Sequence, residues 1–365
     1  MGVMLEIMIL LLGLLPVQTM STDATIADVE YPKNVILIIG DGMGLAHVGL
    51  AMRASKRPLV LEKFPIIGLQ KTHSLTHIIT DSGASATAMA CGEKTYNSSI
   101  GMKRDTTPCA NLMELAHLAG KKTGIVVTSS LVHATPAAFV AHQTFRGFRE
   151  SIASDYLLSD IDYVVGGGLT YFIDRFTDDR NLWDELEAKG YVVADAEHMS
   201  FKHFLKIVPD KIVYFTSLLE PQRRKDGRIY FPEAVEHGMH VLNETGDDGF
   251  FMMVEGSQID YAGHENNRNY LLAEMRDFNE MLAKVMEFAE RDGETLVIVT
   301  SDHSTGGLSI DGGKPGKTAV KSSFKTSRHT ADMVPVYAFG PGAELFSGIF
   351  DNTEIFHKIR TVGRF

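Results

Sequence analysis

Short apolar runs spaced along the chain constrain its fold more than any other feature. The first, NVILIIG at residues 34–40, is continuous and rich in β-branched residues, the pattern of a strand buried on both faces of a parallel sheet. Similar runs lie at residues 123–128, 163–165, 249–254, 295–300 and 334–339. Each is predicted to be a strand.

Helical patterns lie between these runs. At residues 267–291, apolar side chains recur every three or four positions, as one buried helix face requires. Shorter helices are predicted at residues 111–119, 181–189 and 353–360. Because strands alternate with helices, we expect a three-layer α/β/α sandwich with a central, mostly parallel, twisted sheet.

Neither an internal repeat nor a low-complexity linker divides the chain, which at 365 residues is long enough to bury a large core. We therefore predict a single domain over residues 30–365. Residues 147–246 and 306–328 carry fewer candidate catalytic groups or are polar, and we expect them to be peripheral additions.

The N-terminus carries an apolar run at residues 7–17, IMILLLGLLPV, followed by polar Gln18. This run is short for a transmembrane helix and about right for a signal-peptide core, so residues 1–22 are predicted to be a signal peptide and the protein to be secreted or periplasmic. The leading segment contains Glu6 and no Lys or Arg. An uncleaved hydrophobic N-terminus or a misplaced start codon are the alternatives.

The net charge of −11 argues against nucleic acid or an anionic membrane as the main partner. A small phosphate substrate remains compatible with this charge, because bound divalent cations can invert the local field of a site. Cys91 and Cys109 are the two cysteines of the chain. They could pair in an oxidising compartment or stay as buried thiols, and the sequence leaves both open.

Chemically reactive residues follow the predicted strands. Asp41 comes directly after the first run, Glu255 after the run at 249–254, and Asp302 and His303 after the run at 295–300. The run at 123–128 leads to His133 and Thr135. In open α/β sheets, ligands bind beyond the carboxyl ends of the strands, so we expect these side chains to converge on one edge.

Each of these residues also has a plainer interpretation. Asp41 could be a turn residue, and Asp302 could cap the next helix. Asp260 and His264 are four residues apart, so on a helix they share a face and could bind one cation. Together with Glu255 they favour a metal site, whereas His329 in a polar stretch is weak evidence alone.

Residues 80–92, TDSGASATAMACG, form a run of small side chains with helical spacing. One interpretation is a tightly packed helix capped by Asp81 or Ser82. The other places Ser82 at a helix N-terminus, where backbone N–H groups receive an anion. A serine hydroxyl needs a base or a metal ion to become a nucleophile, and no histidine stands in a Ser-His-Asp or Gly-x-Ser-x-Gly pattern nearby. Metal activation is therefore favoured.

Taken together, these segments resemble alkaline phosphatases, in family order from about Tyr31 to the C-terminus. The residues that carry the resemblance are DGMG at 41–44, TDSGASATA at 80–88, HATPAAFVAHQTFR at 133–146, VEGSQIDYAGHENN at 254–267, TSDHSTGG at 300–307, and His329.

The resemblance implies a role for each matched residue. It assigns Asp260, His264 and His329 to a first Zn²⁺, and Asp41, Asp302 and His303 to a second Zn²⁺ beside the Ser82 oxygen. It assigns Asp41, Thr135 and Glu255 to a third ion, usually Mg²⁺. Arg146 then holds the phosphate oxygens and Asp81 orients Arg146.

Two positions depart from the pattern of the bacterial prototypes, which often have Asp where His133 stands and Lys where Tyr261 stands. We expect His133 to lie beside the third site or to reach its ion through water. Both residues are predicted to border the substrate, and without a lysine at Tyr261 phosphate should leave faster. The family suggests a homodimer, with contacts reduced here because the insertions are short.

The function that the resemblance implies is hydrolysis of phosphate monoesters through a phosphoserine at Ser82, at a centre of two Zn²⁺ and one Mg²⁺. A phosphodiesterase, sulfatase or phosphoglycerate mutase of the same superfamily is the nearest alternative. The presence of Thr135, Arg146 and Glu255 favours a monoesterase. A non-catalytic protein that binds metal or phosphate is the alternative of a different class.

Overall fold

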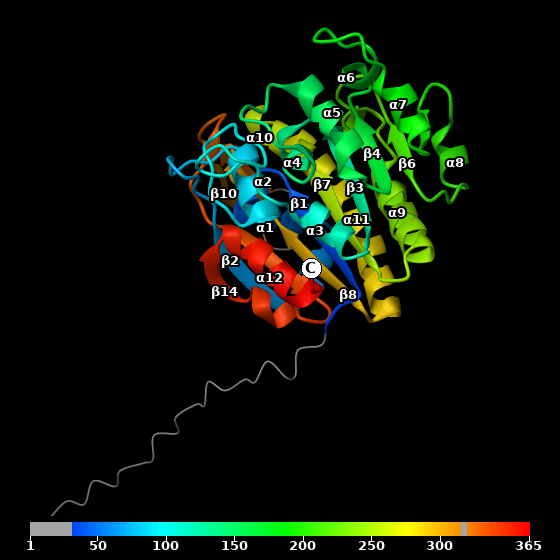
Figure 1. Ribbon diagram of the computed structural model, residues 1–365. Coiled ribbons are helices and arrows are strands. Elements are labelled where there is room, and N and C mark those ends of the chain that lie inside the picture. Colours follow the sequence, from blue (N-terminus) through cyan, green and yellow to red (C-terminus); the bar gives the residue numbers. More distant parts are fainter. Residues whose placement is uncertain (1–30, 315–319) are drawn as a thin grey trace, which may run out of the picture.

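The computed structural model describes residues 31–314 and 320–365, so the predicted signal peptide lies outside the described residues. Its main feature is a ten-stranded sheet at the centre of the molecule (Figure 1). In spatial order the strands are β14 (Gly348–Asp351), β2 (Ile66–Lys71), β13 (Val334–Phe339), β8 (Thr295–Thr300), β1 (Asn34–Gly40), β7 (Phe250–Gly256), β3 (Lys122–Ser130), β4 (Tyr163–Gly167), β6 (Ile212–Phe215) and β5 (Val192–Asp195).

The strands from β8 to β5 all run parallel, and β13 is antiparallel to both of its neighbours, β8 and β2. The reversal of β13 follows from the path of the chain. After β8 the chain stays at the carboxyl edge of the sheet, where it forms β9 (Ser304–Thr305), the hairpin of β10 (Leu308–Gly313) and β11 (Val320–Phe324), and β12 (His329–Thr330). β13 therefore enters the sheet from that edge.

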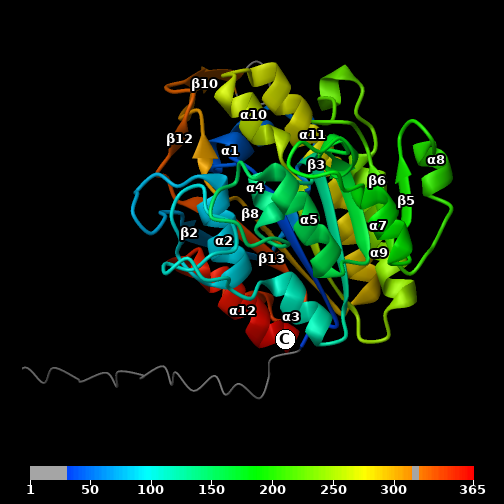
Figure 2. The same cartoon turned by 45° about the horizontal axis from the view of Figure 1, so that its top comes forward.

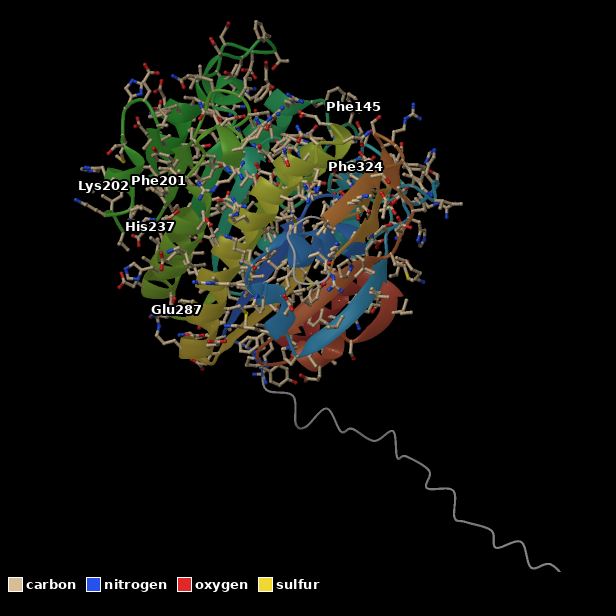
Figure 3. The ribbon with its side chains drawn as sticks, turned by 180° about the vertical axis from the view of Figure 1, so that it is seen from behind. Phe145, Phe201, Lys202, His237, Glu287 and Phe324 are labelled. Atoms are coloured by element: carbon tan, nitrogen blue, oxygen red, sulfur yellow. The ribbon has the colours of Figure 1, made fainter. Side chains whose placement is uncertain are left out.

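Helices cover both faces of the sheet because alternate strand residues point to opposite sides. Val35, Leu37 and Ile39 of β1 belong to one buried core, and Ile36 and Ile38 belong to the other. The first core packs against α2, α3 and α12 in front of the sheet in Figure 1, and the second packs against α9 and α11, which face the viewer in Figure 3. The predicted three-layer α/β/α sandwich is confirmed.

On the first face the helices are α2 (Ser82–Cys91), α3 (Leu112–Leu118), α4 (Ala134–Ala137), α5 (Arg149–Ser159), α6 (Thr170–Ile173), α7 (Leu182–Ala188) and α12 (Thr353–Gly363). On the second face they are α1 (Leu45–Ala54), α8 (Phe201–Phe204), α9 (Phe231–Thr245), α10 (Gln258–His264) and α11 (Arg268–Asp292). Short 3₁₀ turns lie at Val60–Lys63, Arg224–Asp226 and Ala343–Phe346.

The four predicted helices are confirmed, with ends shifted by a few residues. Asn111, Asn181 and Asn267 each stand just before a helix and accept a hydrogen bond from a backbone N–H of its first turn. Asparagine satisfies a donor that the helix leaves unpaired, which explains why α3, α7 and α11 begin where they do.

Other elements were not predicted from the sequence. β5 and β6 have four residues each, and β2 alternates buried with half-exposed positions, so none of them forms a long apolar run. Residues 147–246 contribute β4, β6 and β5, which continue the main sheet rather than start a second one. Among the described helices, none is both long and apolar enough to cross a membrane.

Candidate active site

The predicted convergence at the carboxyl edge of the sheet is found in the structure. Parallel strands β8, β1, β7 and β3 are consecutive, and their carboxyl ends bring together Asp302, Asp41, Glu255 and His133. The three carboxylates are fully buried. Glu255 lies within β7 rather than after it, because β7 extends to Gly256.

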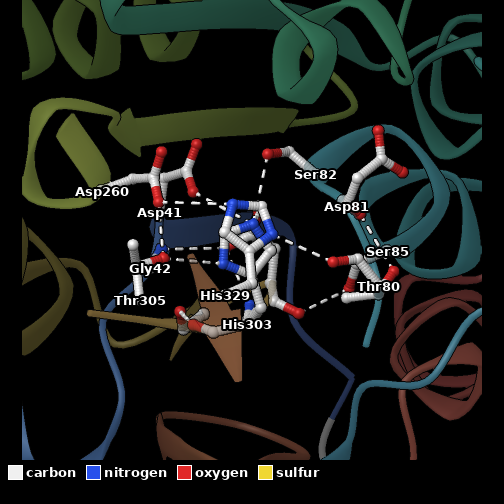
Figure 4. A network of polar contacts seen from close by, with 12 residues as sticks. Asp41, Gly42, Thr80, Asp81, Ser82, Ser85, Asp260, His303, Thr305 and His329 are labelled. Carbon is white, nitrogen blue, oxygen red and sulfur yellow. Dashed lines mark hydrogen bonds and ion pairs between the residues drawn. The ribbon is translucent and has the colours of Figure 1, made fainter. Parts of the chain in front are cut away.

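Ser82 is the first residue of α2 and lies at this same edge (Figure 4). Asp81 caps the helix, since its Oδ1 accepts a hydrogen bond of 3.0 Å from the backbone N–H of Ala84. A Cβ atom on Gly83 would lie 3.0 Å from the carbonyl oxygen of Ser99, so the small side chains do serve close packing. The same packing presents the Ser82 hydroxyl at the N-terminal end of the helix.

The Ser82 hydroxyl contacts a histidine that is far away in the sequence. Its Oγ lies 3.2 Å from Nε2 of His303, and the same nitrogen lies 3.0 Å from Oδ2 of Asp302 and 3.6 Å from Oδ1 of Asp41. In a Ser-His-Asp triad, the imidazole uses one nitrogen for the serine and the other for the carboxylate. Here one nitrogen faces all three groups, which is the geometry of shared cation ligands.

The outer ring nitrogens of the site histidines are held by acceptors. Nδ1 of His264 lies 2.7 Å from the carbonyl oxygen of Ser327, and Nδ1 of His329 lies 3.0 Å from that of Thr80. A carbonyl oxygen only accepts, so both Nδ1 atoms carry a proton and both Nε2 atoms face inward. Such contacts orient imidazoles that bind metal ions.

These inward-pointing nitrogens lie too close together to be stable without a positive charge between them. Nε2 of His264 is 3.1 Å from Nε2 of His329 and 3.2 Å from Oδ2 of Asp260. In the protein alone a proton takes this place, because the hydrogen bond with Asp260 raises the pKa of His264 to about 9. Burial and the charge of His303 lower the pKa of His329 to about 4, which keeps its lone pair free.

Three sets of side chains in the described part of the chain could each hold a metal ion. The sets are Asp260, His264 and His329; Asp41, Asp260 and His303; and Asp41, His133 and Glu255. Imidazole with carboxylate suits zinc, whereas an oxygen-rich set suits a harder ion such as magnesium.

The last of these sets contains buried polar atoms that lack a partner. Among the described residues, none donates a hydrogen bond to either carboxylate oxygen of Asp41 or to Oε1 of Glu255, and Thr135 Oγ1 and His133 Nδ1 are also unpaired. Burial and the nearby charges of Asp302, Asp260 and Glu255 raise the pKa of Asp41 well above its usual range. Burial chiefly raises the pKa of Glu255 to about 8. The oxygens of Asp41, Glu255 and Thr135 therefore fit a bound cation, which would satisfy them.

Arg146 forms a hydrogen-bonded pair with Asp81, the residue before Ser82. Its Nη1 donates to Oδ2 of Asp81 over 3.0 Å, and its Nη2 lies 3.2 Å from Nε2 of His133. The His133 ring packs edge-on against Tyr261 with a centroid separation of 5.7 Å. The pair therefore holds a guanidinium at the residue that precedes the serine, where it can bind an anion.

Two residues of the site were missed by reasoning from the sequence. Thr305 donates a hydrogen bond of 2.5 Å to Oδ1 of Asp260, and its hydroxyl lies 3.2 Å from Nδ1 of His303. It therefore orients one residue of each of the two predicted zinc sites. Glu220 accepts a hydrogen bond of 3.3 Å from the Tyr261 hydroxyl. Thr305 lies in the segment at 300–307, which was a usable signal, whereas nothing in the sequence marks Glu220.

Comparisons with known proteins agree with this geometry. A family model for alkaline phosphatase matches residues 32–327. Alkaline phosphatase 3 of Bacillus subtilis (strain 168) is 33% identical over 410 residues, which cover 88% of this chain and 87% of that protein. Alkaline phosphatase of Escherichia coli (strain K12) is 28% identical over 402 residues, covering 90% of this chain and 85% of that protein.

Among solved structures, the alkaline phosphatase from the Antarctic bacterium TAB5 superposes with a TM-score of 0.86 and 40% sequence identity. The match covers 92% of this chain and 99% of the TAB5 chain. Variants of the TAB5 enzyme in which one histidine is replaced by glutamate or aspartate have been solved with magnesium in a site called M3. They cover the same share of this chain, at 38% identity and TM-scores of 0.86 and 0.85.

Proposed function

Because the chain belongs to the alkaline phosphatase family, whose members hydrolyse phosphate monoesters, we propose that its reaction passes through a phosphoserine at Ser82 beside two Zn²⁺ and one Mg²⁺. The observation that carries this proposal is the position of the Ser82 hydroxyl. It lies at hydrogen-bond distance from a histidine nitrogen that two buried carboxylates also face.

The residues divide into three proposed ion sites. Asp260, His264 and His329 hold the first zinc, Asp41, Asp302 and His303 hold the second, and Asp41, Thr135 and Glu255 hold the magnesium. When bound, such ions stabilise the attacking and leaving oxygens of an in-line displacement. Within the described part of the chain, neither carboxylate oxygen of Asp41 has a hydrogen-bond partner, so both would be free to face an ion.

The chain's own residues bind and orient the substrate. Arg146 offers parallel N–H groups to two phosphate oxygens, and Asp81 fixes the plane of the guanidinium. The N-terminal end of α2 directs backbone N–H groups toward the same anion. Ser82 Oγ attacks phosphorus as the alcohol leaves, and water then displaces the serine oxygen to release phosphate.

His133 is proposed to act through water rather than as a direct ligand. Arginine can only donate, so Nε2 of His133 accepts from Arg146 and its proton sits on Nδ1. A protonated nitrogen cannot bind a cation, but it can donate to a water molecule on the third ion. The TAB5 variants that carry a carboxylate in place of a histidine, with magnesium in site M3, suggest that His133→Asp would convert this indirect contact into a direct one.

We further propose that residues 30–365 form one catalytic domain, with peripheral additions at 147–246 and 306–328, exported by a signal peptide at 1–22. A homodimer in the periplasm or outside the cell, with small-molecule phosphate monoesters as substrates, completes this proposal. Size-exclusion chromatography with light scattering would test the dimer, and N-terminal sequencing of the exported protein would test the cleavage.

Trapping the phosphoenzyme tests the main proposal. Enzyme loaded with zinc and magnesium is mixed with a ³²P-labelled aryl phosphate, quenched in acid and digested, and the label is expected on the peptide that contains Ser82. Ser82→Ala should lose the label and lower turnover by roughly 10³-fold or more. Ser347→Ala, an exposed serine far along the chain, is the control and should keep both.

Label on another residue, or full activity of Ser82→Ala, would show that the proposed nucleophile is wrong. The same preparation should hydrolyse an aryl phosphate monoester faster than the matching diester or aryl sulfate. A preference for the diester or the sulfate would favour the alternative hydrolases of the superfamily.

A further inference from the structure

The two cysteines lie together on the first face of the sheet, away from the ion sites. Cys91 is the last residue of α2, and Cys109 precedes α3, which contacts α2 on the same side of the sheet (Figure 2). Both side chains are buried. The Cys91 thiol donates a hydrogen bond of 3.6 Å to the carbonyl oxygen of Cys109.

The backbone on both sides holds the sulfur atoms in place. Cys109 N–H donates to the carbonyl oxygen of Gly101 over 3.0 Å, next to an antiparallel bridge between Met102 and Pro108. Cys91 is fixed by the end of α2, where Gly92 adopts a left-handed conformation with φ of 72° and donates back to Ala88. Both thiols therefore sit on ordered segments that face each other.

The surroundings of the two thiols differ. His142 lies 2.8 Å from both the Glu114 carboxylate and the Gly101 carbonyl oxygen, and the hydrogen bond with Glu114 raises the pKa of His142 to about 9. The neighbouring Cys91 thiol, together with the charge of His142, lowers the pKa of Cys109, although burial opposes this. Burial raises the pKa of Cys91. The positive charge of His142 therefore favours the thiolate form of Cys109.

We propose that Cys91 and Cys109 are a disulfide-forming site, oxidised by a small disulfide such as oxidised glutathione or by a thiol–disulfide oxidoreductase. The Cys109 thiolate attacks one sulfur of the oxidant, whose S–S bond breaks and whose second sulfur leaves and takes up a proton. Cys91 then loses its proton, attacks the Cys109 sulfur and displaces the second thiol. Two electrons and two protons pass to the oxidant, which is reduced to two thiols.

Cys109 lies close to the protein surface although its side chain is buried. Residues 103–108 and Ala110 are exposed, so the thiol lies one residue beneath the surface of a turn. Opening that turn would admit a small disulfide to the Cys109 thiol.

The ring that the disulfide closes contains a residue that supports the phosphate-binding pair. Ser98 N–H donates to Oδ1 of Asp81 over 3.0 Å, and the Ser98 carbonyl oxygen accepts from the Arg146 N–H over 2.7 Å. Ser98 itself has a positive φ of 73°, a conformation that its neighbours must maintain. A covalent link from 91 to 109 would restrict this loop in the unfolded chain and hold it in the folded one.

The full-length enzyme, loaded with zinc and magnesium, offers a direct test because the chain has only two cysteines. One sample is incubated folded with oxidised glutathione, and a second is refolded in a glutathione redox buffer. After denaturation and alkylation, mass spectrometry should show that both thiols are protected and that peptides containing Cys91 and Cys109 are joined. Thermal unfolding should shift upward by about 5 °C relative to the reduced enzyme.

Cys91→Ser and Cys109→Ser are the matched controls, and neither should gain the shift on oxidation. Two alkylated thiols in both samples, glutathione adducts without the internal link, or only intermolecular cross-links would each overturn the proposal. These readouts do not depend on phosphatase activity, so the disulfide and the proposed reaction are tested separately.

Discussion

Two buried clusters of charged residues in this protein are built in opposite ways. In the first, Arg228 contacts both Glu274 and Asp277 of α11, and Arg224 Nε lies 2.9 Å from Oδ1 of Asp277. In the second, at the carboxyl edge of the sheet, the carboxylates of Asp41, Glu255, Asp302 and Asp260 gather with histidines. No lysine or arginine in the described ranges forms an ion pair with these four.

The difference separates a structural cluster from a functional one. The arginine cluster carries its own positive charge, so it joins the segment before α9 to α11 without outside help. At the sheet edge the positive partners are histidines instead: burial raises the pKa of Asp41 and Glu255, whereas contacts with histidines lower the pKa of Asp260 and Asp302 although burial opposes this. Asp41 and Glu255 lack a lysine or arginine partner in the described ranges, and cations from solution would neutralise them. This contrast leads to five predictions.

The largest effect is expected from Asp41→Asn. The substitution removes a carboxylate that faces two proposed ion sites, so kcat/KM should fall by roughly 10³-fold or more. Because one buried negative charge is lost, the metal-free variant should unfold at a higher temperature than the metal-free wild type. Steady-state kinetics and calorimetry in chelator measure both. If Asp41→Asn kept wild-type activity, or if its metal-free form were less stable than the metal-free wild type, the assignment of Asp41 to an ion-binding cluster would be contradicted.

Asp277→Asn is the matched substitution in the arginine cluster. It should lower stability and leave activity unchanged, the opposite of Asp41→Asn. It removes one of the two carboxylates that face the buried Arg228 guanidinium, so the free energy of unfolding should fall by about 2 kcal/mol. Activity per folded molecule should stay the same, since Asp277 is remote from Ser82. Urea unfolding followed by active-site titration checks both quantities. A loss of activity without a loss of stability would break the comparison.

The stability of the metal-free protein should fall as pH rises. The pKa of Glu255 is raised from its ordinary value of 4.5 to about 8 in the folded state, so its contribution is complete below pH 4.5 and is lost as pH rises through 8. Denaturant unfolding in chelator should show a drop on the order of 2 kcal/mol across this window. Glu255→Gln should reduce the drop, and adding zinc and magnesium should abolish it. A flat wild-type profile in chelator would count against the argument.

Tyr261→Lys places a permanent cation beside the carboxylate-rich cluster, where the tyrosine now packs against His133. The added charge should tighten inhibition by inorganic phosphate roughly 10-fold, equal to about 1.4 kcal/mol, and should slow product release. Tyr261→Phe is the control and keeps the ring without adding charge. An inhibition constant that is equal in all three proteins would refute this effect.

The smallest effect concerns His142 and Glu114, an ion pair that the chain completes by itself. The pKa of His142 is raised from 6.5 to about 9, so its contribution to stability is present below pH 6.5 and is lost as pH rises through 9. A loss of about 1 kcal/mol is expected over this range, and His142→Gln should remove it. The unfolding free energy at pH 6 and pH 9.5, measured with zinc and magnesium present, gives the answer. If the unfolding free energy of His142→Gln fell as much between pH 6 and pH 9.5 as that of the wild type, this prediction would be contradicted.

Much of the fold could be predicted because strands buried on both faces appear in the sequence as continuous apolar runs. β1 and β8 are apolar throughout since both faces are covered, and α11 shows its buried face every three or four residues. β5 and β6 are too short to show a period, and the direction of β13 depends on where the preceding loops lie. Those features are set by tertiary contacts.

The contacts of the site likewise divide into those that the sequence predicts and those that depend on the folded structure. Asp260 and His264 could be paired from the sequence, because their spacing puts them on one face of α10. The contact between Ser82 and His303 joins residues 221 positions apart, and only the folded sheet brings them together. Glu220 comes from the segment that carried few candidate groups, and its role depends on the position of the Tyr261 hydroxyl.

The central claim is that the carboxylate-rich cluster at the sheet edge is completed by cations next to the Ser82 hydroxyl. Anomalous diffraction at the zinc edge, from crystals of the zinc- and magnesium-loaded enzyme, tests it most directly. We predict two zinc peaks, one among Asp260, His264 and His329, and one among Asp41, Asp302 and His303 at about 2 Å from its ligands. The absence of both peaks in crystals with demonstrated activity, or zinc bound elsewhere in the molecule, would contradict the claim.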